Sequence, residues 1–141
     1  MGAAAQSPRP LRVMVYSDDK TVRRAVLNAL GTRPAVDLPE LEFIEVATGP
    51  MAVRTADKGQ LDLLILDGEA VPEGGLGLCR QLKDEIFRCP PILVLTGRPQ
   101  DAWLATWSRA DAAVGHPIEP AQLAATVAAL LRRRLPAVQT A

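Results

Sequence analysis

The stretch at residues 61–67, Leu-Asp-Leu-Leu-Ile-Leu-Asp, constrains the fold of this chain more than any other. An apolar run that ends on a carboxylate is typical of a parallel strand buried on both faces, and such a strand carries its last residue to the edge of the sheet. Asp67 followed by Gly68 is also an ordinary turn signal. Asp67 is therefore either a simple turn former or the carboxylate at the centre of a site.

The rest of the chain alternates between strand patterns and helix patterns. Strands are expected at residues 11–16, 41–47, 61–67, 92–95 and 112–114, and helices at 21–30, 48–59, 76–89, 99–109 and 119–134. This alternation predicts an α/β domain of the flavodoxin-like class, a three-layer (βα)5 sandwich around a parallel five-stranded sheet in the order 2-1-3-4-5. Polar residues alternate with apolar ones at 41–47, which places that strand nearer the sheet edge.

Length and charge narrow the class of protein. A chain of 141 residues suits one domain that buries its core without disulfides or structural metal. We expect a disordered segment at 1–10, the domain at 11–134 and a tail at 135–141. Sixteen basic and sixteen acidic residues cancel, so nothing indicates a nucleic-acid partner. No run approaches the ~20 apolar residues of a membrane span and 1–10 lack the apolar centre of a signal peptide, which predicts a cytoplasmic protein without a membrane partner.

Two further features are interpreted as structural. Cys79 and Cys89 form no metal-binding pattern, which indicates reduced thiols without a catalytic role. The basic run Arg132 to Arg134 is expected to be the solvated end of the last helix, where positive charge complements the helix dipole.

Polar side chains follow four of the five predicted strands. Asp18 and Asp19 follow the first strand, Asp67 ends the third, and Thr96 and His116 follow the fourth and fifth. The carboxyl ends of these strands converge on one crevice in this fold class. Carboxylates brought together there repel one another unless a cation lies between them, and oxygen ligands suit Mg²⁺. The hydroxyl and the imidazole would complete the surroundings of an anion formed on Asp67, such as an aspartyl phosphate.

From residue 11 to residue 131 the chain resembles the receiver domain of two-component response regulators. The resemblance is carried by the opening strand and helix at 13–23, the acceptor strand Leu63 to Asp67, the loop re-entry at Gly75-Leu76, the strand end Val94-Leu-Thr-Gly97, and His116-Pro117 in the place of the family's Lys-Pro.

The resemblance implies a role for each site residue. Asp67 would accept phosphate, Asp18, Asp67 and the main-chain carbonyl of Glu69 would hold Mg²⁺, and Thr96 and His116 would sense the phosphoryl group. A sensor histidine kinase or a phosphotransfer protein would supply the phosphate, and a downstream protein would read the state. Such a protein is not an enzyme.

Three positions depart from the family pattern. Ser17 falls at the first place of the usual acidic pair, which predicts weak Mg²⁺ binding, whereas a shift of one residue would make Asp18 and Asp19 the pair. His116 replaces a lysine, is mostly neutral near pH 7 and has a shorter arm, so we expect it to fall short of the phosphate. The alternative interpretation is that His116 is a histidine before proline without a specific role. Ala113 replaces the usual switch aromatic, so any switching would use backbone or helix movement.

Trp103 and Trp107 lie one turn apart on the predicted fourth helix. Such a pair belongs either to a core or to an interface, and both rings cannot easily be buried together with Leu104. By resemblance, the face formed by the fourth helix, fifth strand and fifth helix is the partner surface, and it would also serve a homodimer. We expect one tryptophan to meet a partner there.

Three functions compete. The leading one is a single-domain response regulator that signals by protein contact, because the chain ends soon after the fifth helix. The alternative is a pseudo-receiver that acts as an interaction module without phosphorylation, favoured by Ser17, Ala113 and His116. A flavodoxin-like enzyme or nucleotide binder would need a glycine-rich phosphate loop after the first strand, where Ser17-Asp18-Asp19 stands instead.

Overall fold

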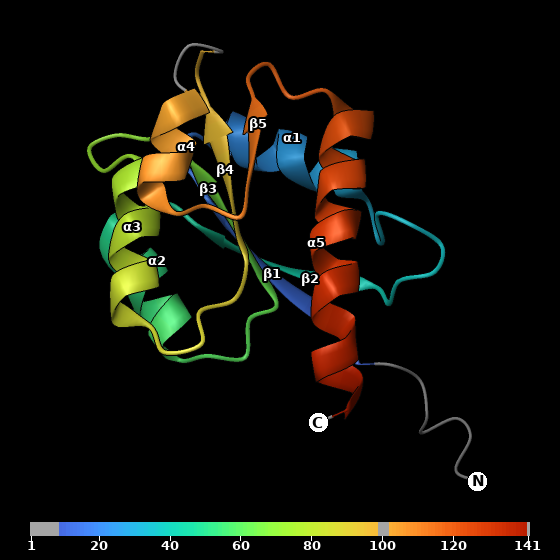
Figure 1. Cartoon of the computed structure of the whole chain (residues 1–141). Coiled ribbons are helices and arrows are strands. Elements are labelled where there is room, and N and C mark those ends of the chain that lie inside the picture. Colours follow the sequence, from blue (N-terminus) through green and yellow to red (C-terminus); the bar gives the residue numbers. More distant parts are fainter. Residues whose placement is uncertain (1–8, 99–101, 141) are drawn as a thin grey trace, which may run out of the picture.

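A computed structural model describes residues 9–98 and 102–140 (Figure 1). The elements alternate as expected: β1 (Leu11–Tyr16), α1 (Lys20–Leu30), β2 (Leu41–Val46), α2 (Gly49–Asp57), β3 (Leu63–Asp67), α3 (Gly75–Glu85), β4 (Ile92–Thr96), α4 (Ala102–Ser108), β5 (Ala112–Gly115) and α5 (Pro120–Thr140). Most of the expected disordered segment, 1–8, and the first residues of the expected fourth helix, 99–101, lie outside the described residues.

The five strands form one parallel sheet in the order β2-β1-β3-β4-β5, which confirms the predicted topology. β2 is an edge strand, as its alternating pattern indicated. The register brings the strand ends to a common level: Tyr16 pairs with Leu66, Asp67 with Leu95, and Thr96 with Gly115. The residues that follow β1, β3, β4 and β5 therefore meet at one edge of the sheet.

Both faces of the sheet are covered (Figure 1). Along β3, Leu63 and Ile65 belong to the core cluster beneath α1 and α5, whereas Leu64 and Leu66 belong to the cluster beneath α2 and α3. All four side chains are fully buried. At about 1.5 to 3 kcal/mol for each buried leucine or isoleucine, this strand anchors both layers and fixes the position of its end.

The C-terminal ends of two helices differ from the sequence prediction by more than two residues. α3 ends at Glu85 rather than near Cys89, because Ile86 already has extended backbone angles and its N–H bonds to the Leu82 carbonyl. α5 continues past Arg134 to Thr140, where a tail was expected, because Leu135 still packs against the core beneath this helix.

The basic run of α5 consequently does not lie at a helix end. Arg132 donates to both oxygens of Asp37, at 2.8 and 2.9 Å. Arg134 donates to Asp62 and to the carbonyl of Leu61, at 3.4 and 3.2 Å. The expectation that the whole run is a solvated, dipole-complementing end was wrong, because two of its arginines bind to acids and carbonyls of neighbouring loops. Among residues 9–98 and 102–140, no helix is both long enough and apolar enough to cross a membrane.

Candidate functional site

A cavity of about 350 Å³ lies where the carboxyl ends of the central strands meet. It is lined by Asp18, Asp19, Val22, Asp67, Glu69, Val71, Gly97 and His116. Four of the residues predicted for the site, Asp18, Asp67, Glu69 and His116, are therefore brought together. Thr96 is buried at the end of β4 beside them, and its carbonyl accepts a hydrogen bond from the His116 N–H at 2.8 Å.

Asp67 is 3% exposed and ends β3 at the floor of this cavity. Its Oδ2 accepts a hydrogen bond from the Ser17 hydroxyl at 2.8 Å. Its Oδ1 accepts one from the Glu69 N–H at 2.9 Å and lies 3.2 Å from His116 Nε2. The carboxylate is thus fixed by two neutral donors and an imidazole, and it still faces a cavity that could admit a reactant.

Ser17 is the site residue that sequence reasoning had noted only as a departure. It is fully buried, and its hydroxyl lies between Asp67 and the backbone of the next loop. The signal that could have found it is its position directly after β1, since the register places that position beside the end of β3.

The structure also distinguishes Asp18 from Asp19. Asp19 is the N-cap of α1, with extended backbone angles, and its Oδ1 accepts the N–H of Thr21 at 2.8 Å. The capping hydrogen bond holds the Asp19 carboxylate at the start of α1. Asp18 Oδ1 reaches across the cavity to accept the N–H of Val71 at 3.0 Å. This arrangement favours the unshifted alignment, in which Asp18 is the second acid of the site.

The loop after β3 is held close to the sheet. A Cβ atom on Gly75 would lie 2.7 Å from the Asp67 carbonyl oxygen, so only glycine permits this approach. The Tyr16 hydroxyl donates to the Glu73 carbonyl at 2.5 Å. Burial, and then the charge of Glu73, raise the pKa of Tyr16, which keeps this donor protonated. The loop therefore holds Glu69 beside Asp67.

The available donors are oxygen atoms, which suit a hard cation. Within the described part of the chain, no group of three or more His, Cys, Asp or Glu side chains is placed so that it could hold a metal ion. The cavity offers two carboxylates, Asp18 and Asp67, together with the main chain of Glu69. Mg²⁺ typically takes one or two carboxylates and retains several waters, so this donor set fits Mg²⁺.

The ring of His116 reaches the acceptor carboxylate, with Nε2 3.2 Å from Asp67 Oδ1, and whether it also reaches a phosphoryl group on that residue stays a prediction. Its side chain is 23% exposed and lies on the β5 side of Asp67. On the preceding strand, Ala113 is exposed and carries no ring that could report the state of Thr96.

Both tryptophans of α4 are exposed, Trp103 by 65% and Trp107 by 46%. The Arg80 guanidinium lies 5.0 Å from the centroid of the Trp107 ring, and its Nη1 donates to the Trp107 carbonyl at 2.6 Å. Such a cation–π contact holds that ring against α3. The core interpretation is wrong for both residues, and Trp103 is the more accessible of the two.

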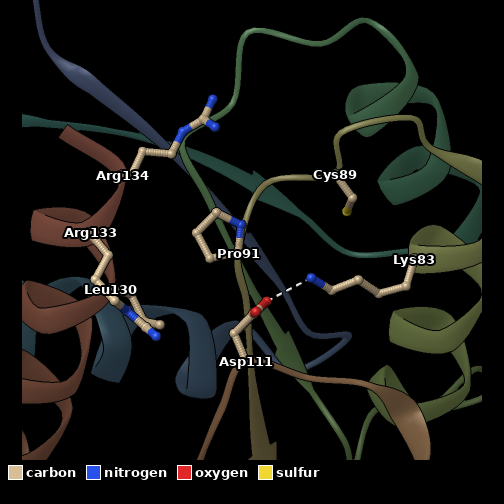
Figure 2. A pocket seen from close by; sticks show the side chains of 7 residues that line it. All are labelled: Lys83, Cys89, Pro91, Asp111, Leu130, Arg133 and Arg134. Atoms are coloured by element: carbon tan, nitrogen blue, oxygen red, sulfur yellow. Dashed lines mark hydrogen bonds and ion pairs between the residues drawn. The ribbon is translucent and has the colours of Figure 1, made fainter. Parts of the chain in front are cut away.

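A second cavity, of about 320 Å³, lies at the opposite end of the sheet (Figure 2). Lys83 of α3 and Arg133 and Arg134 of α5 line it, with Cys89 and Pro91 from the loop before β4. Its lysine is paired with Asp111 at 2.7 Å. Burial raises the pKa of Cys89, which disfavours the reactive thiolate. The candidate site is therefore the cavity around Asp67.

Comparisons with known proteins agree with this geometry. No family model matches the chain. Over 126 residues it is 60% identical to an uncharacterized response regulatory protein of Mycobacterium tuberculosis, found in two strains. The matched residues make up 89% of this chain and 95% of that protein.

Solved structures share the fold. The chemotaxis response regulator CheY4 of Vibrio cholerae superposes with a TM-score of 0.73 at 22% identity, covering 87% of this chain and all of that one. The signal receiver domain of an HD domain-containing protein from Pseudomonas fluorescens gives 0.75 at 14% identity, covering 94% of each chain. At these identities, the two structures bear on the fold alone.

Proposed function

The chain belongs to the response regulators of two-component signalling and has their receiver domain, and on this premise we propose that Asp67 accepts a phosphoryl group. The observation that carries the proposal is the Asp67 carboxylate itself. It is buried at a strand end, faces a cavity, and is held by the Ser17 hydroxyl and the Glu69 N–H rather than by arginine or lysine. A carboxylate without a strong cationic partner keeps its electron pairs available for attack.

In the reaction, an Asp67 oxygen attacks the phosphorus of the donor. A new carboxylate O–P bond forms while the bond from phosphorus to the leaving group breaks, and the leaving group departs with that electron pair. Bound Mg²⁺ would supply positive charge between the carboxylates and the phosphoryl oxygens. Asp18, Asp67 and the carbonyl of Glu69 are the groups that would hold it.

Thr96 and His116 are proposed to sense the product. Thr96 ends β4 and His116 follows β5, and the two backbones are joined by the hydrogen bond between the His116 N–H and the Thr96 carbonyl. A phosphoryl group on Asp67 would attract both side chains. Movement of either would therefore be transmitted along β4 and β5 toward α4 and α5.

The proposed partners are those that membership of the response regulators implies. A sensor histidine kinase or a phosphotransfer protein would supply the phosphate in the cytoplasm, and a downstream protein would bind the face that carries Trp103 and Trp107. This face would also be the contact surface of a homodimer. We propose that the chain is not an enzyme, because the phosphoryl group stays on its own side chain and changes its state instead of being turned over.

Incubation with acetyl phosphate and Mg²⁺, followed by intact-mass measurement, tests the proposal. We expect one added phosphoryl group on the wild type and none on Asp67→Asn. Asp19→Asn is the matched control, because Asp19 lines the same cavity but caps α1, and it should be labelled like the wild type. An unlabelled wild type, under conditions that label another receiver domain, would contradict the proposal and favour the pseudo-receiver.

A further inference from the structure

The two oxygens of Asp67 face different sides of the cavity. Oδ2 points to the end of β1, where it accepts the Ser17 hydroxyl, and Asp18 follows directly in the chain. Oδ1 points to the loop after β3 and to β5, where the Glu69 N–H and the His116 ring lie. Oδ2 is therefore held by the Ser17 hydroxyl, and Oδ1 lies beside groups that can donate to an anion.

The direction of the Ser17 hydroxyl proton is fixed. Ser17 Oγ accepts the N–H of Asp19 at 3.0 Å, so the single hydroxyl proton is available for Asp67 Oδ2 at 2.8 Å. The side chain is fully buried, so water does not compete for this proton.

The backbone of Ser17 is held as firmly as its hydroxyl. Its N–H donates to the Val46 carbonyl at 3.2 Å, and its carbonyl accepts from Arg23 Nη1 at 2.6 Å. Arg23 Nε in turn donates to Glu45 at 3.1 Å. The hydroxyl thus approaches Asp67 from a rigid support built from β1, β2 and α1.

We propose that Ser17 is the positioning residue of the acceptor, which holds Oδ2 and thereby presents Oδ1 for phosphoryl transfer. The inference rests on the proposed function of Asp67. Oδ1 forms the new bond to phosphorus, the bond from phosphorus to the leaving group breaks, and Glu69 N–H and His116 then lie beside the incoming phosphoryl oxygens. Because the hydroxyl already satisfies Oδ2, acceptance relies less on Mg²⁺ than it would without Ser17.

Replacements at position 17 should separate these contributions. Ser17→Ala removes the donor and leaves Oδ2 dependent on a cation. Ser17→Asp places a second buried anion against Asp67, which requires a cation between them. Ser17→Thr retains the hydroxyl and tests whether the donor alone restores the wild-type behaviour.

The experiment measures the initial rate of phosphorylation by acetyl phosphate over a series of Mg²⁺ concentrations, from excess chelator to saturation. At the lowest Mg²⁺, Ser17→Ala should be slower than the wild type by about tenfold, as expected for losing a hydrogen bond to a charged group. The deficit should shrink as Mg²⁺ rises, and Ser17→Thr should remove most of it. An equal deficit at every Mg²⁺ concentration would show a merely structural role and overturn the inference.

A second readout does not depend on phosphorylation. The thermal unfolding midpoint, measured with and without Mg²⁺, should rise little for the wild type and markedly for Ser17→Asp. Equal responses would contradict the claim that Ser17 supplies what a cation otherwise would. If the wild type is not labelled even at saturating Mg²⁺, the proposed function fails, whereas labelling of all variants with the same Mg²⁺ dependence refutes only the role of Ser17.

Discussion

An aspartate is buried at each end of the β3 segment, and the two carboxylates are held in opposite ways. Asp62, directly before the strand and 0% exposed, accepts two hydrogen bonds from Arg9 at 3.1 Å, one from the Arg12 N–H at 2.8 Å, and one from Arg134 at 3.4 Å. Among the described residues, the hydrogen-bond partners of Asp67 at the other end are two neutral donors and a histidine. Burial alone therefore does not make a carboxylate reactive.

The two carboxylates differ in whether positively charged side chains compensate their negative charge. The arginines that pair with Asp62 are Arg9 of the N-terminal segment and Arg134 of α5. Through these ion pairs, Asp62 connects both segments to the amino end of the sheet. Within the described residues, Asp67 forms no ion pair with an arginine or lysine, and it lines a cavity. The amino end of the sheet is therefore expected to determine stability, and the carboxyl end to carry the chemistry.

The largest expected effect separates the two aspartates by stability. Asp62→Asn should lower the free energy of unfolding by about 1 to 3 kcal/mol, because donors at a buried position lose a charged acceptor. Arg9 is 52% exposed and can regain water, which keeps the loss below the about 3 to 5 kcal/mol of a fully buried pair. Urea unfolding monitored by tryptophan fluorescence measures the difference.

Asp67→Asn is the matched variant. We expect it to change the free energy of unfolding by less than about 1 kcal/mol, since the amide oxygen still accepts one of the neutral hydrogen bonds. If Asp67→Asn lowered the free energy of unfolding more than Asp62→Asn, the amino end of the sheet would not be the end that determines stability.

The difference between the two aspartates should shrink if Asp67 is given a permanent cation like those that Asp62 already has. His116→Lys should strengthen the conformational response to a phosphate mimic, because a permanent charge forms a charge-assisted bond with the new anion. The expected gain is about 1 kcal/mol, which is about fivefold in the ratio of the two states.

Amide chemical shifts along α4 and α5, with and without the mimic, report this response. His116→Gln is the neutral control, and it should respond no more strongly than the wild type. An equal response in His116→Lys would mean either that the histidine already supplies the contact or that this contact does not drive the change.

The smallest expected effect concerns the thiols of α3 and the loop that follows it. Burial raises the pKa of Cys79 from 9.0 to about 11. The unfolded thiol therefore ionises first as pH rises, so stability is unaffected well below pH 9 and falls between the two values, by under about 1 kcal/mol at about pH 9.5. Cys79→Ala should remove this part of the pH dependence. An unchanged slope in that variant would show that the thiol stays neutral in both states.

Much of the fold was predictable, because every strand is either a mostly apolar run or, in β2, an alternating one, and every helix begins near a capping or turn residue. Asp67 was found because its burial pattern and its place at a strand end are both local features. Asp62 was overlooked within the same run, because its partners Arg9 and Arg134 are distant in sequence and only the packing of α5 brings them together.

The finer features of the site depended on side-chain geometry that the sequence pattern does not fix. Whether Asp19 joins Asp18 in an acidic pair depends on where α1 starts, and the hydrogen bond from Thr21 to Asp19 shows that Asp19 caps this helix. The exposure of both Trp103 and Trp107 reflects a short α4 that presents one face outward, and the helical period alone could not tell which face. Domain boundaries and the roles of individual site residues stay predictions.

The position of the phosphoryl group would identify which aspartate is the acceptor. After treatment with acetyl phosphate and Mg²⁺, sodium borohydride reduces an aspartyl phosphate to the corresponding alcohol, so the modified residue becomes homoserine and can be located by peptide mass spectrometry. We expect homoserine at position 67 and at no other aspartate, and none at all in Asp67→Asn. Homoserine at position 18 or 19, or its absence from a wild type treated alongside a receiver domain that is labelled, would contradict the assignment of Asp67 as the phosphoryl acceptor.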